Sequence, residues 1–275
     1  MPFEEKVASI EGISYSYLQG GEGFPVMMIH GSGPGASTAG NWAKVLEPLS
    51  NFCAIYAMDL IGFGRSGRKS APPFFDFELW FEQCRAMIEL LPGREIGIIG
   101  HSISGALALR LAACERRVAK VLTTGCMGAP FTVNEDTIRV WTFPRNRDEL
   151  VRAARGLIHD HRLIDEAYLQ TRERVLFGDP SYGDYFDSMF VGDKQAYVQA
   201  SLLASEELSR IRCDIVMMHG RDDRPFPAEP LTLTLAKSIP QADVHLLGQC
   251  FHSIAMEYPQ KLIDAALALF RDAAQ

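Results

Sequence analysis

The segment Ile96-Gly97-Ile98-Ile99-Gly100-His101-Ser102-Ile103-Ser104-Gly105-Ala106-Leu107 decides how this chain folds. Its first four residues form an apolar run without polar alternation, which is typical of a parallel strand buried on both faces. After Ser102, leucines recur among small residues and predict a helix packed against that strand. Ser102 falls on the tight turn between the two, where a strained backbone needs small neighbours. The pattern predicts a nucleophilic serine raised at a sheet edge.

The turn matches the pattern G-x-S-x-G at one glycine position and departs from it at the other. Gly100 occupies the first position, whereas Ser104 occupies the second and Gly105 follows it. Serine is small enough for such a turn. The alternative is an ordinary serine between a strand and a helix, so the choice depends on partners elsewhere in the chain.

A serine hydroxyl is a poor nucleophile at neutral pH, so it needs a base to take its proton and a carboxylate to orient that base. Asp223 follows one apolar run and His252 follows the next. Because the carboxyl ends of parallel strands meet at one edge of a sheet, we expect both to lie near Ser102. The adjacent Asp222 is the alternative acid.

Apolar runs alternate with amphipathic stretches through most of the chain. The expected strands cover residues 7–10, 13–18, 25–30, 53–60, 96–99, 118–124, 213–219 and 243–247. The expected helices between them cover residues 41–49, 77–91, the stretch from 103 onward, 231–238 and 259–271. This alternation predicts an α/β fold, with a mostly parallel eight-stranded sheet covered by helices on both faces and a hairpin at its amino-terminal end.

Residues 134 to 209 lack a convincing strand and carry amphipathic helical patterns instead. These patterns cover residues 134–142, 147–158, 163–177, 182–190 and 193–204. Proline and glycine punctuate them. We therefore predict a core of residues 1–130 and 210–275, interrupted by an all-helical lid, residues 131–209, inserted before the strand that carries the acid.

The glycine-rich loop His30-Gly31-Ser32-Gly33-Pro34-Gly35-Ala36 follows a buried strand. It is either a bare connector or a loop whose backbone N–H groups approach a ligand. Attack by Ser102 creates an oxyanion, which two fixed N–H donors stabilise. The natural pair is the N–H of Ile103, next to the nucleophile, and the N–H of Ser32. We expect these two groups to form an oxyanion hole.

Composition excludes several classes of protein. The net charge is −7 and the basic residues are scattered, which disfavours a nucleic-acid partner. No apolar stretch reaches the ~20 residues of a membrane helix, and the first residues lack the pattern of a secretory signal. The six cysteines form no C-x-x-C pair and no zinc-site spacing, so we expect reduced thiols, a cytoplasmic protein, and neither a metal nor another cofactor.

Together these features resemble the α/β-hydrolase superfamily, whose triad has the chain order Ser102, Asp223, His252. The spacing G-x-x-D-x-x-x-P that contains Asp223 is similar to the acid loop of that superfamily and favours Asp223 over Asp222. More narrowly, the chain resembles the meta-cleavage-product hydrolases, which split carbon-carbon bonds in vinylogous diketones produced by aromatic ring fission. The segments that carry this resemblance are residues 30–36 with Asn41-Trp42, residues 59–64 and residues 219–224.

This resemblance implies residues for substrate binding. In that family a lid arginine and an asparagine near the glycine loop bind the dienol and carboxylate end of the substrate. Arg172 and Asn41 match them by context, although Arg172 can also be interpreted as an exposed charge on a lid helix. We expect the substrate pocket to include Gly31, Gly33 and Ser253 as well.

The chain departs from the family at positions near the reacting bond. It has His101, Ser104 and Ser253 where the family usually has asparagine, glycine and tryptophan, so substrate choice can differ. We expect a serine hydrolase acting on a ring-cleavage diketone, a carboxylated dienol. The alternatives are an esterase, lactonase or amide hydrolase with the same triad, and a small-molecule sensor on a hydrolase scaffold. A hydrophobic lid surface would suit a homodimer.

Overall fold

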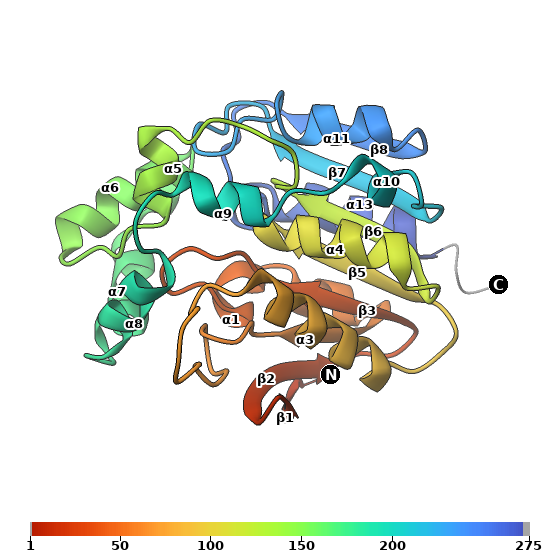
Figure 1. The fold of residues 1–275 in the computed structure, drawn as a ribbon, viewed down its shortest axis with the longest axis horizontal. Coiled ribbons are helices and arrows are strands. Elements are labelled where there is room, and N and C mark those ends of the chain that lie inside the picture. Colours follow the sequence, from red (N-terminus) through yellow and green to blue (C-terminus); the bar gives the residue numbers. More distant parts are fainter. Residues whose placement is uncertain (1, 272–275) are drawn as a thin grey trace.

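The apolar run that begins at Ile96 lies near the middle of an eight-stranded sheet in the computed structural model, which describes residues 2–271 (Figure 1). The sheet order is β1-β2-β4-β3-β5-β6-β7-β8. The strands are β1 (Glu4–Ile10), β2 (Ile13–Gly20), β3 (Phe24–Ile29), β4 (Cys53–Met58), β5 (Ile96–His101), β6 (Val118–Thr124), β7 (Asp214–Gly220) and β8 (Ala242–Leu247). The β1/β2 and β2/β4 pairs are antiparallel and the other pairs are parallel, so the predicted mostly parallel sheet is confirmed.

Both faces of the sheet are buried because side chains alternate along each strand. In β3, Met27 and Ile29 join one core, while Val26 and Met28 join the other. The first core contains residues of α3 (Phe77–Leu90), α4 (Ile103–Cys114) and α11 (Thr232–Ser238). The second contains residues of α1 (Thr38–Trp42), α2 (Leu46–Ser50), α12 (Ile254–Glu257) and α13 (Pro259–Arg271). The inner strands are therefore apolar throughout because helices pack against both faces of the sheet.

The single helix expected over residues 41–49 is wrong, because the structure has two short helices there, α1 and α2. Pro48 has no N–H to donate to the carbonyl four positions earlier, and its ring would crowd that carbonyl, so it fits the first turn of α2 but not the interior of one helix over residues 41–49. The buried side chains of Trp42, Val45 and Leu49 still face one core. Their spacing therefore predicted correctly which side chains are buried, but it did not reveal that the helix is divided in two.

Helices occupy the chain between β6 and β7. They are α5 (Glu135–Val140), α6 (Arg147–Leu157), the 3₁₀ helix η1 (His161–Leu163), α7 (Glu166–Phe177), α8 (Tyr182–Met189), α9 (Gln195–Ala200) and α10 (Ser205–Leu208). In Figure 1, α5 to α8 gather beyond one end of the sheet, on the left, whereas α10 returns to pack against α4. A division of the chain at residues 131 and 209 stays a prediction.

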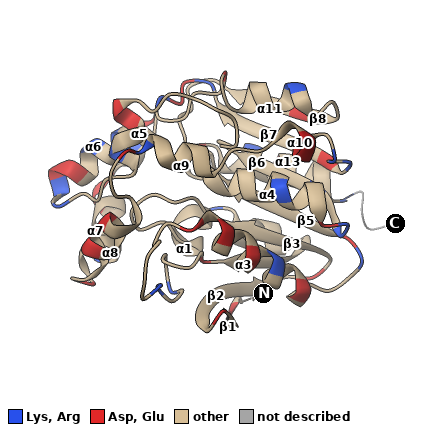
Figure 2. Ribbon diagram, in the orientation of Figure 1, with Lys and Arg blue, Asp and Glu red and all other residues tan. Residues whose placement is uncertain are grey.

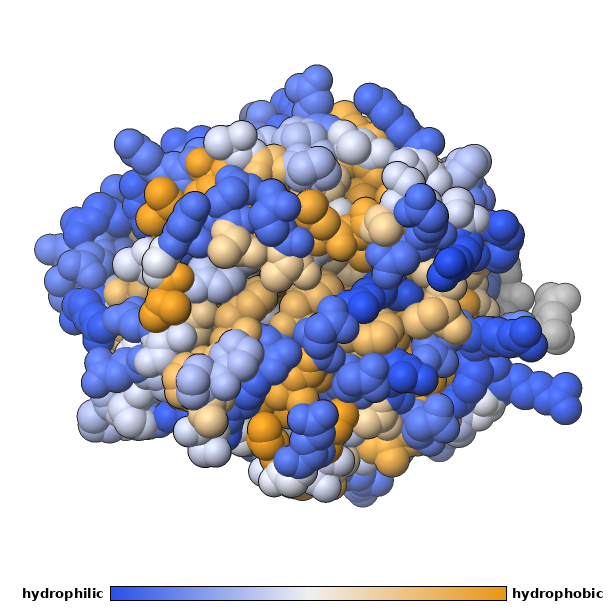
Figure 3. All heavy atoms as spheres, viewed as in Figure 1, coloured by the Kyte–Doolittle hydropathy of each residue, from blue (hydrophilic) through white to orange (hydrophobic). Residues whose placement is uncertain are grey.

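The surface carries charges of both signs. Figure 2 shows acidic and basic residues interspersed along the helices, consistent with scattered charge. On the face seen in Figure 3, hydrophilic side chains dominate the margin, and apolar groups show between them toward the middle. Within residues 2–271, no helix combines the length and apolar character needed to cross a bilayer.

Candidate active site

Ser102 sits on a strained turn between β5 and α4. Its backbone φ is 61° and its ψ is −124°, in a region that residues other than glycine rarely adopt. The Ser102 N–H donates to the Thr124 carbonyl at 2.9 Å, which fixes the turn to the neighbouring strand. A Cβ on Gly100 would lie 2.4 Å from the Ser104 carbonyl oxygen, so only glycine fits there. The local sequence thus builds a sharp strand-to-helix turn with Ser102 at its apex.

Ser104 fits the second position of the turn because its hydroxyl has a partner. The side chain is fully buried, and its Oγ donates to the His30 carbonyl at 2.5 Å. That bond joins α4 to the start of the glycine loop. Gly105 is the residue that permits close packing, since a Cβ there would lie 2.7 Å from the Cys126 sulfur.

Asp223 and His252 meet although 29 residues separate them in the chain. His252 Nδ1 lies 2.7 Å from Asp223 Oδ2, and both side chains are buried. Burial alone would raise the pKa of the Asp223 carboxyl, but the charge of His252 and hydrogen bonds from His219 and His252 lower it to about 2. Asp222 instead accepts the Gln249 N–H at 2.8 Å. The carboxylate that orients His252 is therefore that of Asp223.

His219 supports the same carboxylate, and the sequence reasoning missed it. Its Nε2 lies 2.8 Å from the Phe226 carbonyl oxygen and 3.3 Å from Asp223 Oδ2. A carbonyl only accepts, so Nε2 carries the proton, and Nδ1 accepts from the Thr232 hydroxyl at 2.7 Å. The signal available in the sequence was the spacing of His219 and Asp223, four residues apart across the end of a strand.

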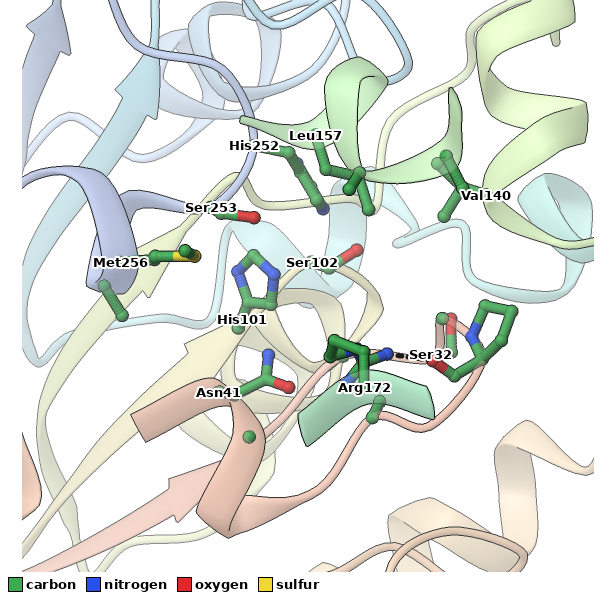
Figure 4. A pocket seen from close by; sticks show the side chains of 18 of the residues that line it. Ser32, Asn41, His101, Ser102, Val140, Leu157, Arg172, His252, Ser253 and Met256 are labelled. Atoms are coloured by element: carbon green, nitrogen blue, oxygen red, sulfur yellow. Dashed lines mark hydrogen bonds between the residues drawn. The ribbon is translucent and has the colours of Figure 1, made fainter. Parts of the chain in front are cut away.

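Ser102 and His252 line a cavity of about 150 Å³ beneath the helices that follow β6 (Figure 4). In this view His252 lies on one side of Ser102, with Asn41 and Arg172 on the other. Apolar side chains from α5 to α7 form much of the wall, namely Val140, Leu150, Ala153, Ala154, Leu157 and Leu176. The predicted pocket residues that line the cavity are Gly31, Ser32, Gly33, Asn41, Arg172 and Ser253.

The two predicted oxyanion donors, Ile103 and Ser32, lie in different surroundings. Ser32 lines the cavity, whereas Ile103 is fully buried and follows the cavity-lining Ser102 directly. Within residues 2–271, neither the Ile103 N–H nor the Ser32 N–H donates a hydrogen bond. A Cβ on Gly31 would lie 3.2 Å from the Ser102 Cβ, so the glycine loop passes close to the serine. The oxyanion hole formed by these two amides stays a prediction.

Side chains from the helices above the cavity hold the glycine loop in place. Trp141 Nε1 donates to Ser32 Oγ at 3.1 Å, and the Gly35 N–H donates to the Tyr182 hydroxyl at 2.9 Å. Arg172 donates to the Pro34 carbonyl and, at 3.0 Å, to the Gly35 carbonyl. Arg172 is thus directed into the site instead of into solvent. Trp141 and Tyr182 were not predicted, because contacts over such long sequence separations leave no local pattern.

One nitrogen of the Arg172 guanidinium, Nε, is buried without a hydrogen-bond partner within residues 2–271, and the same is true of the Trp42 Nε1. Both residues line the cavity. An unpaired buried donor is costly, so each of these two groups calls for an explanation.

A sequence model described as "Alpha/beta hydrolase family" matches residues 26–265. The chain belongs to the alpha/beta hydrolase family. Its eight-stranded sheet and the serine turn after β5 agree with that membership.

Named relatives of this alpha/beta hydrolase match it over most of its length. It is 29% identical to a 2-hydroxymuconate semialdehyde hydrolase of Pseudomonas sp. (strain CF600) over 248 residues, covering 90% of this chain and 87% of that protein. It is 28% identical to a 2-hydroxy-6-oxo-2,4-heptadienoate hydrolase of Pseudomonas putida, covering 90% of this chain and 88% of that protein.

Among solved structures, the alpha/beta hydrolase is similar to the meta-cleavage product hydrolase of Pseudomonas fluorescens IP01. The TM-score is 0.90 at 26% identity, covering 98% of each chain. The 2-hydroxy-6-oxo-6-phenylhexa-2,4-dienoate hydrolase of Rhodococcus sp. strain RHA1 gives a TM-score of 0.87 at 25% identity, covering 98% of this chain and 99% of that one.

His101 brings a second imidazole into the site of this alpha/beta hydrolase. Its ring centroid lies 4.6 Å from that of His252. Its Nδ1 lies 3.1 Å from the Thr124 carbonyl oxygen, which only accepts, so Nδ1 carries the proton and Nε2 is left as an acceptor. Burial and the neighbouring His252 hold the pKa of His101 well below its ordinary value. His101 is therefore neutral near pH 7.

Stability should fall as the pH is lowered from about 7.5 to about 5.5. Burial lowers the pKa of both His30 and His101 below the value of about 6.5 expected in the unfolded chain. Below that value the unfolded chain binds protons that the folded chain does not. Each histidine then lowers the free energy of unfolding by up to about 1.4 kcal/mol per pH unit.

Urea unfolding at both pH values measures this effect. The variant His101→Asn, which cannot titrate, should lose less stability than the natural protein between the two pH values. Asp223, with its lowered pKa, contributes stability that is lost only between about pH 4 and pH 2, outside this window. Equal losses in both proteins would contradict the assignment for His101.

Proposed function

We propose that this alpha/beta hydrolase uses Ser102 to cleave a carbon-carbon bond in a vinylogous diketone, a meta-cleavage product of aromatic ring degradation. The observation that carries the proposal is the joint arrangement of the cavity. Ser102 and the Asp223-oriented His252 lie on one part of its wall, and Arg172, with its unpaired Nε, lies on another with Asn41. A nucleophile facing a cation suits a substrate with an electrophilic carbonyl and a carboxylate.

Each member of the triad has a defined task in this proposal. His252 takes the proton of the Ser102 hydroxyl as Ser102 attacks the carbonyl carbon. Asp223 accepts from Nδ1 of His252, which keeps Nε2 available as the base and stabilises the imidazolium. The N–H groups of Ile103 and Ser32 receive the oxyanion, and loss of one such donor typically costs ~3 kcal/mol. No cofactor enters this reaction scheme.

Bond cleavage needs an electron sink, which the substrate supplies after ketonisation. In this step the enol proton is lost and a proton is added to the carbon next to the remote carbonyl, with His252 and the anion-binding residues assisting. Ser102 then attacks that carbonyl, and the adjacent carbon-carbon bond breaks as its electron pair passes into the conjugated 2-oxo acid. The dienoate fragment leaves, and an acyl group remains on Ser102. Water, activated by His252, releases the acid.

The polar side of the cavity provides the carboxylate subsite in this proposal. The Arg172 guanidinium and the Asn41 side chain would bind the carboxylate and the enol oxygen. Gly31 and Gly33 let the substrate pass close to the loop backbone, and Ser253 lines the wall beside His252. The apolar wall formed by α5 to α7 would take the opposite end of the substrate.

The named relatives support this substrate class. Two of them are described as hydrolases of 2-hydroxymuconate semialdehyde and of 2-hydroxy-6-oxo-2,4-heptadienoate, which are small carboxylated compounds. We infer by analogy a small-molecule substrate of the same kind. A cytoplasmic location, for which the free cysteines would be suited, and a homodimer remain predictions.

The deciding experiment mixes the protein in a stopped-flow instrument with 2-hydroxymuconate semialdehyde and, separately, with p-nitrophenyl acetate. Rapid loss of dienol absorbance with slow ester turnover supports the carbon-carbon hydrolase. Fast ester turnover with an unchanged dienol would replace it with the esterase alternative. Inactivity toward both, with the dienol bound in a titration, would favour a sensor.

Arg172→Ala should lower kcat/KM for the carboxylated dienol by about a hundredfold, because a buried charged hydrogen bond to the carboxylate is lost. Turnover of neutral p-nitrophenyl acetate should change by less than about threefold, since that ester has no carboxylate to bind. Steady-state kinetics with both substrates measure the difference. The matched control is Arg174→Ala, an exposed arginine on the same helix. Equal losses with both substrates would show that Arg172 acts by holding the Pro34 and Gly35 carbonyls instead.

A further inference from the structure

The carboxylate of Glu257 joins two segments that meet beside His252. Its Oε2 accepts the His159 N–H at 2.7 Å and the Asp160 N–H at 3.2 Å. Its Oε1 accepts the Phe251 N–H at 3.0 Å. Glu257 lies on α12, directly after the loop that carries His252, whereas residues 159 and 160 lie between α6 and η1 above the cavity. The Glu257 side chain thus joins the loop before α12 to the segment between α6 and η1.

A second link reinforces the first. The His252 N–H and the Ser253 N–H both donate to the Leu157 carbonyl, at 3.1 Å and 3.0 Å. The His159 ring stands edge-on to the Phe251 ring with 5.0 Å between centroids. The backbone of His252 is therefore held on one side by its own loop and on the other by residues 157–160.

Glu257 is well suited to this role because it is half-buried and accepts from three backbone N–H groups, with the Cys250 thiol as a further donor at 3.7 Å. Burial raises the pKa of Glu257, while the N–H donors of Phe251, Asp160 and His159 oppose that rise. Hydrogen bonds from amides to a carboxylate are stronger than bonds between neutral groups. Removal of the carboxylate would leave these buried donors without partners, which favours a rearrangement of the loop.

We propose that Glu257 is a positioning residue, which sets the place of His252 relative to Ser102 by joining the loop at Phe251 to residues 159 and 160. This inference rests on the proposed role of His252 as the base. Glu257 and the Leu157 carbonyl join the two parts to each other, so the inference predicts that a change at residues 157–160 alters the geometry of the base. A displacement of about 1 Å at the base can cost a hundredfold in rate.

The test measures phosphonylation of Ser102 by a fluorophosphonate under stopped-flow conditions. In this reaction the bond from Ser102 Oγ to phosphorus forms, fluoride leaves, and His252 takes the serine proton. The rate constant for each active site does not depend on the fraction of folded protein, so a loss of stability alone does not change it. Glu257→Gln, of the same size, should lower this rate constant between about tenfold and a hundredfold.

Steady-state kinetics should place most of the loss of Glu257→Gln in kcat, because Arg172 and Asn41, which bind the carboxylate end in the proposal, lie away from this junction. Asp264→Asn is the matched control. Asp264 is an exposed acid on α13 whose one side-chain partner within residues 2–271 is Gln260, so the rate constants of Asp264→Asn should equal those of the natural protein.

A second pair of variants tests the same link from the other side. Asp160 has φ −79°, which proline can adopt, so Asp160→Pro removes the N–H that donates to Glu257. Asp160→Ala removes only the side chain and serves as its control. Asp160→Pro should lower the phosphonylation rate constant by about threefold to tenfold, and Asp160→Ala should not.

The two changes should not multiply when they are combined. Because both break one link, Glu257→Gln with Asp160→Pro should be as slow as Glu257→Gln alone. The inference would be overturned if the double variant lost the product of the two single losses, or if Glu257→Gln reacted with the rate constant of the natural protein. If Glu257→Gln does not fold, the comparison of Asp160→Pro with Asp160→Ala decides alone. Failure of the natural protein to react at Ser102 would overturn the proposed function instead.

Discussion

Ser102→Ala should lower kcat for the best substrate by about 10⁴-fold or more, the largest effect expected of any single substitution. Without the hydroxyl no acyl-enzyme forms, although the oxyanion donors and the cavity remain. The backbone strain of the turn should persist, because alanine at φ 61° keeps the Cβ that serine has. Binding of the dienol should persist, so a substrate complex should accumulate and be visible in its absorbance spectrum.

Ser188→Ala is the control for this experiment. Ser188 lies on α8, is partly exposed, and donates only to the Asp184 carbonyl. Its kcat should equal that of the natural protein in the same stopped-flow assay. Normal turnover by Ser102→Ala would rule out a covalent mechanism and leave direct attack by water.

Asp223→Asn should lower kcat by about 10⁴-fold, the second largest effect. An amide in place of the carboxylate can offer its NH₂ group to His252 Nδ1, which stabilises the tautomer with its proton on Nε2. That tautomer cannot accept the proton of Ser102. The same change removes the negative charge that lies 3.3 Å from His219 Nε2.

Asp222→Asn provides a control from the adjacent residue. Asp222 accepts the Gln249 N–H and does not reach His252, so kcat should stay within about twofold of the natural value. Both variants are measured with the dienol and with the ester. A larger loss in Asp222→Asn than in Asp223→Asn would reverse the assignment of the acid.

Local sequence patterns predicted the strands and turns whose conformation is determined by residues close to them in the chain. The buried strand at Ile96 and the turn at Ser102 are encoded within a dozen residues, because a doubly covered strand must be apolar and a strained turn needs Gly100. The mostly parallel sheet followed from the alternation of strands and helices. It placed Asp223 and His252 at the same sheet edge, where they hydrogen-bond.

Interactions between distant residues could not be predicted in this way. Trp141 and Ser32 lie 109 residues apart in the chain, and Gly35 and Tyr182 lie 147 apart. Neither pair produces a periodic pattern, since each depends on how the helices settle over the sheet. Pro48 illustrates a different failure, because the apolar spacing of one buried face outweighed a residue that interrupts the helix.

The contacts of Trp141, Tyr182 and Arg172 with the glycine loop bear on how such enzymes can be recombined. These side chains lie on α7, on α8 and directly after α5, yet they hold the glycine loop that follows β3, including Ser32. A chimera that takes the helices between β6 and β7 from a relative would exchange the supports of the glycine loop together with the pocket wall. Such a graft would work only if these helices and the loop were transplanted as one unit.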